Sequence, residues 1–117
     1  MHTREKGAFG EDAAAKFLKS RGFEIVAKNY CIRGNLHGGE VDIIARKGTM
    51  LHFVEVKSRI SDTFGMGREA VTPAKQRNIR RAATHYLVTH GLVDKIQCCF
   101  DVVEITPTGA ELFENCF

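Results

Sequence analysis

Two apolar runs flank a tight turn between residues 40 and 58, and this pattern constrains the fold more than any other part of the sequence. The first run is "VDIIA" and the second is "LHFVEV", both rich in the β-branched and aromatic residues that favour strands. A Lys-Gly-Thr segment joins them, and Gly48 suits the positive φ that a two-residue turn requires. The pattern therefore predicts a β-hairpin whose two strands are largely buried.

The rest of the chain adds helices and strands on both sides of this hairpin. We expect a helix over the first 21 residues, a strand over 23–30, a second helix over 72–91 and a buried strand over 98–106. Gly22 and Gly91 are suitable helix stops, and Thr72 with Pro73 is a typical helix start. Residues 110–117 could add an edge strand. The order αβββαβ predicts an α/β fold, with a mixed central sheet flanked by helices.

Length and composition narrow the class of protein. The 117 residues suffice for one domain, spanning 1–117, and 44% hydrophobic with 26% charged residues is typical of a soluble globular protein. No apolar stretch approaches the length of a membrane span, and the N-terminus lacks the apolar core of a signal peptide, so we expect a cytoplasmic protein with no membrane partner. The net charge of +3 is a weak indication of an anionic partner.

The charges of the hairpin lie at its open end. If Gly48 and Thr49 form the turn, Asp42 lies opposite Glu55 and Glu40 lies opposite Lys57. Alternation then places these side chains on one sheet face, together with Ile44, Leu51 and Phe53. Opposed carboxylates destabilise a sheet, and a divalent cation such as Mg²⁺ between them would remove the conflict.

A simpler interpretation is a solvated strand end at which Glu40 and Lys57 form a cross-strand ion pair. The strands that carry these charges are otherwise apolar on both faces, and partly buried charge is costly unless it is paired or bound to metal. Lys57 lies on the same face as Glu55 and could stabilise a developing negative charge. We therefore favour a metal site.

Asp42 and the tripeptide Glu55-Val56-Lys57 resemble the core signature of PD-(D/E)xK nucleases, with Glu40 near the first acid. Five blocks resemble, in order and over nearly the whole chain, the YraN (UPF0102) family: "GEDAAAKFL", "GGEVDIIA", "FVEVKSR", "KQRNIRRAATHYL" and "FDVVEI". The resemblance implies a restriction-endonuclease-like core, related in fold to archaeal Holliday-junction resolvases.

The resemblance also implies an active site made of Glu11, Asp42, Glu55 and Lys57. The three carboxylates would hold one or two Mg²⁺ or Mn²⁺ ions, and the backbone carbonyl of Val56 could add a ligand. The implied chemistry is metal-assisted hydrolysis of phosphodiester bonds in nucleic acid, with Lys57 stabilising charge on the phosphate. Glu11 has independent support, because it shares an apolar helix stripe with Ala14 and Leu18.

Several further residues are candidate substrate contacts. Lys75 and Gln76 begin the second helix on its inner side, whereas Arg77 and Arg81 fall on the opposite, exposed side, which we interpret as a solvated face. The candidate substrate contacts are Glu40, Lys75, Gln76 and Arg59, and the other arginines that could reach backbone phosphates are Arg33, Arg46 and Arg68. No aromatic platform for single-stranded bases is evident, which favours duplex or branched substrates. As the nucleic-acid partner we expect DNA rather than RNA.

The sequence departs from the family pattern in two places. Cys99 stands where the family usually has an Arg, and the Gly-rich connection that contains His37 is longer than usual. We expect His52, His85 and His90 to be structural, and we assign no chemical role to Asp101 or Glu104.

The alternative function is a non-catalytic nucleic-acid-binding module with the same fold. A redox or zinc protein is the third reading, but Cys31, Cys98, Cys99 and Cys116 lack the spacing for it. A homodimer is implied only by analogy with resolvases.

Overall fold

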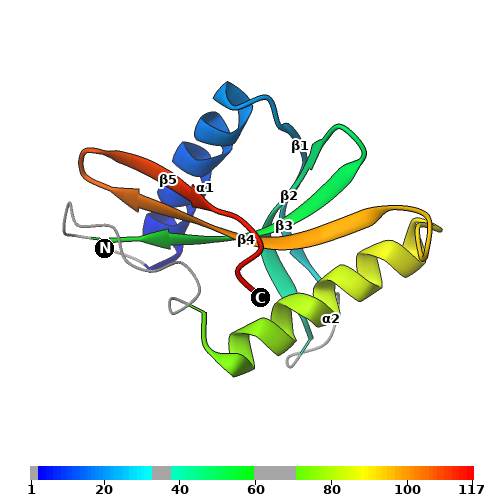
Figure 1. Cartoon of the computed structure of the whole chain (residues 1–117). Coiled ribbons are helices and arrows are strands. Elements are labelled where there is room, and N and C mark those ends of the chain that lie inside the picture. Colours follow the sequence, from blue (N-terminus) through cyan, green and yellow to red (C-terminus); the bar gives the residue numbers. More distant parts are fainter. Residues whose placement is uncertain (1–2, 33–37, 60–70) are drawn as a thin grey trace.

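A computed structural model describes residues 3–32, 38–59 and 71–117 of the chain, which form two helices and five strands (Figure 1). The elements are α1 (Thr3–Ser20), β1 (Glu24–Cys31), β2 (Glu40–Lys47), β3 (Met50–Ser58), α2 (Pro73–Thr89), β4 (Gln97–Thr106) and β5 (Gly109–Phe113). Arg33, His37 and Arg68 lie outside the described residues. The predicted order αβββαβ is therefore correct as far as β4, and the chain then adds one strand.

The five strands form one mixed sheet in the order β1-β2-β3-β4-β5. β3 and β4 are parallel, and every other neighbouring pair is antiparallel. The parallel pair is joined by a crossover that contains α2, which is the usual connection for parallel strands. The mixed sheet flanked by helices is confirmed, and the edge strand expected within residues 110–117 is β5, antiparallel to β4.

The hairpin of β2 and β3 has the predicted register. Ile44 pairs with Phe53 and Lys47 pairs with Met50, around a turn in which Gly48 has a φ of 60°. The ladder ends at the pair Ile43 and Val54. Beyond this pair, a side-chain hydrogen bond takes the place of the next backbone hydrogen bond of the ladder. The N–H of Val56 donates it to Oδ2 of Asp42 at 2.8 Å.

The two faces of the sheet bury two separate hydrophobic clusters. One face packs Ile44, Phe53 and Val102 against α2, and the other packs Ile43, Val54 and Val103 against α1. The helices contribute their buried stripes, which are Ala14, Ala15 and Leu18 in α1 and Ile79, Ala82, Ala83 and Tyr86 in α2. Each fully buried aliphatic side chain stabilises the fold by about 1.5–3 kcal/mol. The clusters fix both helices against the strand ends that carry the charged residues.

Neither of the two helices in the described residues is long and apolar enough to cross a membrane.

Candidate functional site

The charged residues of the hairpin gather where β2 begins and β3 ends. Asp42 lies next to Glu55, close enough for its negative charge to raise the pKa of the Glu55 carboxyl group. Asp42 is fixed through the Val56 N–H, so one of its oxygens is already occupied by the backbone. The side chains of Asp42 and Glu55 therefore meet at the point where the two strands stop sharing backbone hydrogen bonds.

Glu55 is the most strongly perturbed of these groups. Its side chain is almost completely buried, and burial together with the negative charge of Asp42 raises the pKa of Glu55 to about 8. Its Oε2 lies 3.9 Å from Lys57 Nζ and 3.8 Å from Lys75 Nζ, and both ammonium groups partly offset the rise in pKa. Its Oε1 is buried and has no hydrogen-bond partner among the described residues. An unpartnered carboxylate oxygen in a buried position is costly and demands an explanation.

Helix α2 reaches the site through Lys75. The Nζ of Lys75 also lies 3.6 Å from Oε1 of Glu40, so this lysine bridges two carboxylates from different strands. A β-carbon on Gly39 would overlap the backbone of Asn78 and Ala82, so the absence of a side chain lets the chain enter β2 directly beneath α2. Glu40 therefore pairs with Lys75, and the cross-strand ion pair with Lys57 that the register suggested is replaced by a contact with the helix.

Helix α1 contributes Glu11 from the opposite side of the sheet. The Glu11 side chain is 9% exposed, and burial followed by the charge of Asp42 raises its pKa. The Asn29 side chain donates a hydrogen bond to Glu11 and opposes that rise. The neighbouring Asp12 turns outward and pairs with Lys28 at 2.8 Å. The structure thus brings Glu11 to Asp42, as its place on the apolar stripe suggested.

Asn29 is a residue that the sequence analysis did not single out. It has a φ of 55° within β1, a conformation that asparagine tolerates better than the surrounding residue types. The signal in the sequence was an asparagine inside a strand pattern, where asparagine is otherwise depleted. Its backbone conformation and its bond to Glu11 make it a supporting residue of the site.

Two predicted substrate contacts, Gln76 and Arg59, have hydrogen-bond partners within the protein. The Gln76 side chain donates to the carbonyl oxygen of Val71 at 3.0 Å, so it supports the start of α2. The guanidinium of Arg59 is held by Glu104, and the Arg59 N–H donates to the Ile105 carbonyl at 2.8 Å. The side chains of both residues are therefore held by partners other than Asp42 and Glu55.

The fully buried Glu104 is the second residue near the strand end that the sequence analysis left without a role. It pairs in register with Lys57 across the parallel strands, and its Oε2 has no hydrogen-bond partner within the described residues. The same signal that drew attention to Glu55, an acid inside an apolar strand, was present in "FDVVEI". Glu104 positions Arg59 at the end of β3.

A different cluster satisfies the spacing of three metal ligands. Within the described residues, His52, Cys99 and Asp101 form the one group of three whose ligand atoms all lie within 4.8 Å of one another. All three are buried, and they lie at the packed middle of β3 and β4, where His52 also makes an edge contact with the Phe23 ring. The carboxylates Glu11, Asp42 and Glu55 are not drawn together as tightly.

The distances within the His52 cluster are those of a hydrogen-bonded network. His52 Nδ1 lies 2.6 Å from Asp101 Oδ2 and 2.9 Å from Cys99 Sγ. Ligand atoms around a tetrahedral zinc ion stand further apart, at about 3.4 Å for ordinary metal–ligand bond lengths. Asp101 Oδ1 accepts a hydrogen bond from the Asn115 N–H at 3.0 Å, and burial raises the pKa of the Cys99 thiol above its usual range. The cluster therefore fastens the C-terminal segment to the sheet, which agrees with the structural role predicted for His52.

Comparison with known proteins places the chain in a family. The model of the family described as "Uncharacterised protein family UPF0102" matches residues 10–105. A UPF0102 protein of Symbiobacterium thermophilum, STH1475, is 46% identical over 105 residues, which cover 90% of this chain and 85% of the relative. This chain belongs to the UPF0102 family. The resemblance to the YraN family, which is the same family, is thereby confirmed.

Other UPF0102 proteins match over a similar extent. The protein lpg2994 of Legionella pneumophila is 41% identical over 103 residues, covering 88% of this chain and 84% of the relative. The protein GSU0650 of Geobacter sulfurreducens is 44% identical over 105 residues, covering 90% and 78%. The matched UPF0102 region includes every carboxylate and lysine of the site described above.

Proposed function

We propose that this protein is a metal-dependent nuclease that hydrolyses phosphodiester bonds in nucleic acid, DNA rather than RNA, with duplex or branched substrates favoured. The observation that carries the proposal is Glu55, a buried carboxylate that lies next to Asp42 and two lysines and has one oxygen with no partner among the described residues. The PD-(D/E)xK type of core is part of this proposal. It is supported by the placement of Asp42, Glu55 and Lys57 at the end of the central hairpin.

The donor set fits a hard divalent ion such as Mg²⁺ or Mn²⁺. Such ions are bound by one or two carboxylates together with water and substrate phosphates. Asp42 and Glu55 supply the carboxylates, the Val56 carbonyl is a further candidate ligand, and Glu11 lies next to Asp42. In the metal-free protein a proton between the two acids takes the place of the cation, which agrees with the raised pKa of Glu55. When bound, the ion would supply an activated water and neutralise charge on the phosphate.

The residues of the chain would bind and orient the phosphodiester. Lys57 and Lys75 approach Glu55 Oε2 from different elements, so both ammonium groups are held near the place where the phosphate must lie. Fixed positive charges of this kind stabilise the negative charge that develops in the transition state. Glu40 keeps Lys75 in position, and Asn29 does the same for Glu11. Lys57 is the residue proposed to act directly on the reacting phosphate.

The test is a cleavage assay with Mg²⁺ or Mn²⁺ on linear, single-stranded, flapped and four-way DNA, with RNA of the same sequence alongside. The matched control is Glu55→Gln purified by the same procedure, because it removes the charge, keeps the shape and carries the same trace contaminants. We expect cleavage by the wild type that EDTA abolishes and that the variant lacks. Equal cleavage by both proteins, or binding of nucleic acid with no cleavage in either metal, would overturn the enzyme and favour a binding module.

A further inference from the structure

Glu104 is a second buried acid beside the candidate site. Its side chain is fully buried, and the burial of a charged group is costly unless the group is paired. The Nε of Arg59 donates a hydrogen bond to Oε1 of Glu104, whereas Oε2 has no hydrogen-bond partner among the described residues. An arginine binds a carboxylate most strongly through two parallel hydrogen bonds that use both oxygens. The Glu104–Arg59 pair therefore does not have the geometry that would best stabilise the fold.

Arg59 lies on the same strand and the same face as the lysine of the candidate site. Its backbone N–H donates to the Ile105 carbonyl at 2.8 Å, so the pairing of β3 with β4 continues beyond the last residue of β3. Side chains alternate along a strand, which places Glu55, Lys57 and Arg59 on one face. Glu104 is on this face too, because it pairs in register with Lys57 across the parallel strands. The Glu104–Arg59 pair therefore stands directly beside Lys57.

The pair exposes the guanidinium to solvent and hides the carboxylate. The side chain of Arg59 is 36% exposed, whereas that of Glu104 is 0% exposed. The bond to Glu104 uses Nε of Arg59, and the two terminal nitrogens of the guanidinium carry further donors. A ligand that approaches from solvent would therefore meet the guanidinium and not the acid that holds it.

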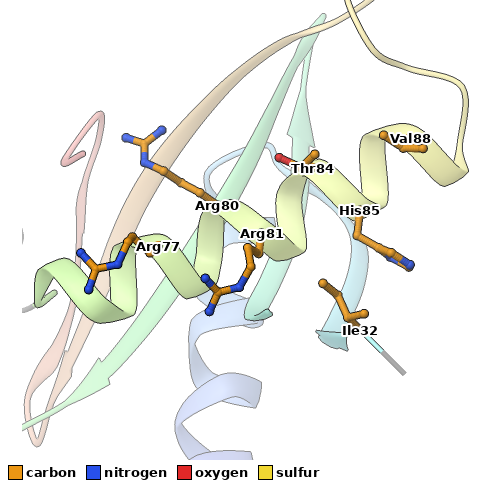
Figure 2. Close-up of a pocket in the computed structure, with 7 residues that line it drawn as sticks. All are labelled: Ile32, Arg77, Arg80, Arg81, Thr84, His85 and Val88. Carbon is orange, nitrogen blue, oxygen red and sulfur yellow. The ribbon is translucent and has the colours of Figure 1, made fainter. Parts of the chain in front are cut away.

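The arginines of α2 are placed differently (Figure 2). Arg77, Arg80 and Arg81 line a hollow of about 550 Å³ whose wall is almost entirely apolar. Arg77 and Arg81 are exposed, as the sequence predicted. Lys75, which reaches the site from α2, precedes Arg77 by two positions and so lies on the opposite side of the helix. Arg59, in contrast, lies on the strand that ends in the site.

We propose that Glu104 is a positioning residue, which holds the Arg59 guanidinium toward the phosphate next to the one at Lys57. Strand β3 would then contact two successive phosphates of one nucleic-acid strand. Two residues of a β-strand span about 7 Å, and neighbouring phosphates of a nucleic-acid chain have a similar separation. The planar guanidinium suits phosphate oxygens, and a buried partner fixes its orientation. This inference rests on the proposed function and extends it, since it gives the direction in which the substrate strand runs past the carboxylates.

The test measures the binding of a labelled DNA duplex by fluorescence anisotropy, in Ca²⁺ and between about 50 and 200 mM salt. We expect Glu104→Leu, which removes the acceptor of Arg59, to bind about 10-fold more weakly, the effect of losing one charge-assisted hydrogen bond. Glu104→Gln keeps a neutral acceptor and should lose less. The direction of the change is decisive, because removing a negative charge that had no positioning role would strengthen binding to DNA.

Arg59→Gln supplies the second half of the test. It should reduce the slope of log K against log salt by about 0.9, the effect of one lost phosphate contact. Adding Glu104→Leu to Arg59→Gln should cause no further loss, because Glu104 acts through Arg59. The matched control is Arg77→Gln, an exposed arginine on the side of α2 away from Lys75, and it should retain the wild-type slope. Tighter binding by either Glu104 variant, additive losses, or equal slopes for Arg59→Gln and Arg77→Gln would overturn the proposal.

Cleavage of the same duplex in Mn²⁺ or Mg²⁺ separates this inference from the proposed function. If the wild type cleaves but the Glu104 variants bind as tightly as it does, the positioning role is wrong and the nuclease proposal stands. If the variants bind as expected but no protein cleaves, the nuclease proposal fails and the phosphate contact belongs to a binding module. A wild type that does not bind nucleic acid refutes both. Melting curves show which variants are folded, and Glu104→Gln carries the comparison if Glu104→Leu does not fold.

Discussion

Strand β3 buries two ionisable side chains three residues apart, and their surroundings are opposite in kind. His52 contacts the Phe23 ring and belongs to a network in which Asp101 has a partner for each of its oxygens. Glu55 contacts Lys75 of α2 and has an oxygen with no partner in the described part of the chain, a carboxylate neighbour and a pKa raised to about 8. Both side chains are about 4% exposed. Burial alone therefore does not distinguish the two groups, and what sets Glu55 apart is an unpartnered oxygen combined with a second carboxylate and two lysines beside it.

The largest effect should come from neutralising the carboxylates of the proposed site. We expect Glu55→Gln and Asp42→Asn each to reduce metal-dependent cleavage about 10²- to 10³-fold, the usual cost of losing a key electrostatic group in an active site. Single-turnover rates on duplex DNA measure the loss. Asp101→Asn, the equivalent change in the other cluster, should leave the rate close to that of the wild type. Comparable losses in all three variants would mean that the two regions do not differ in function.

The second effect concerns stability and should appear only in the His52 cluster. Asp101→Ala leaves His52 and the Asn115 N–H without their acceptor, so we expect the free energy of unfolding to fall by about 2–4 kcal/mol. Urea denaturation measures the change. Glu111→Ala, on the exposed face of β5, should change the free energy by no more than about 0.5 kcal/mol. A loss below about 1 kcal/mol for Asp101→Ala would contradict the fastening role of this network.

The third effect is the pH dependence of stability. Because the folded-state pKa of Glu55 is raised from 4.5 to about 8, the folded protein holds a proton there that the unfolded chain has released. The free energy of unfolding should therefore fall as the pH rises through this window, by at most about 1.4 kcal/mol per pH unit. Glu55→Gln should remove about 1–3 kcal/mol of that decline between pH 5 and 8, a partial effect because the charge is shared with Asp42.

Urea titrations of both proteins at pH 5 and at pH 8, in EDTA, measure this difference. His90→Gln is a suitable control, since His90 is an exposed residue at the end of α2, remote from Glu55 in the chain. Parallel pH profiles for the wild type and Glu55→Gln would show that Glu55 titrates normally.

The smallest effect is the response to Mn²⁺. At ten times its dissociation constant, an ion that binds only the folded state adds about 1.4 kcal/mol to the free energy of unfolding. Above pH 8, where both carboxylates are charged, we expect Asp42→Asn to melt higher than the wild type in EDTA, because one of two adjacent charges is gone, and to gain less when Mn²⁺ is added. Differential scanning fluorimetry records both shifts. Equal Mn²⁺ shifts, with a lower melting temperature for the variant in EDTA, would rule out the opposed carboxylates as ligands.

The alternation of the hairpin and its glycine turn were enough to predict the register, and with it the meeting of Asp42 and Glu55. These are local features, because a two-residue turn fixes the pairing of its own strands. The helix start at Thr72 could be predicted because it is also a local feature. The Thr72 side chain accepts a hydrogen bond from the N–H of Lys75, three residues along the chain, at 3.2 Å.

Contacts between distant segments could not be predicted in this way. The His52 network depends on the parallel register that pairs His52 with Cys99, and no local pattern fixes that register. The simpler interpretation paired Glu40 with Lys57, because a hairpin gives only the residue opposite. In the structure Lys75 reaches Glu40 from α2, which lies in close contact with Gly39. Gln76 was predicted from helical periodicity to face the site, but a nearer acceptor, the Val71 carbonyl, holds its side chain.

The residues of the proposed site come from four different elements, and this affects when the site forms during folding. Glu11, Asp42, Glu55 and Lys75 come from α1, β2, β3 and α2, and β3 and β4 pair only after the crossover through α2 has closed. Pairing between distant segments is slow compared with the formation of a hairpin. A nascent chain that has formed β2 and β3 thus holds the two acids without Lys75, and the proposed site gains its full set of charged groups only when folding is complete.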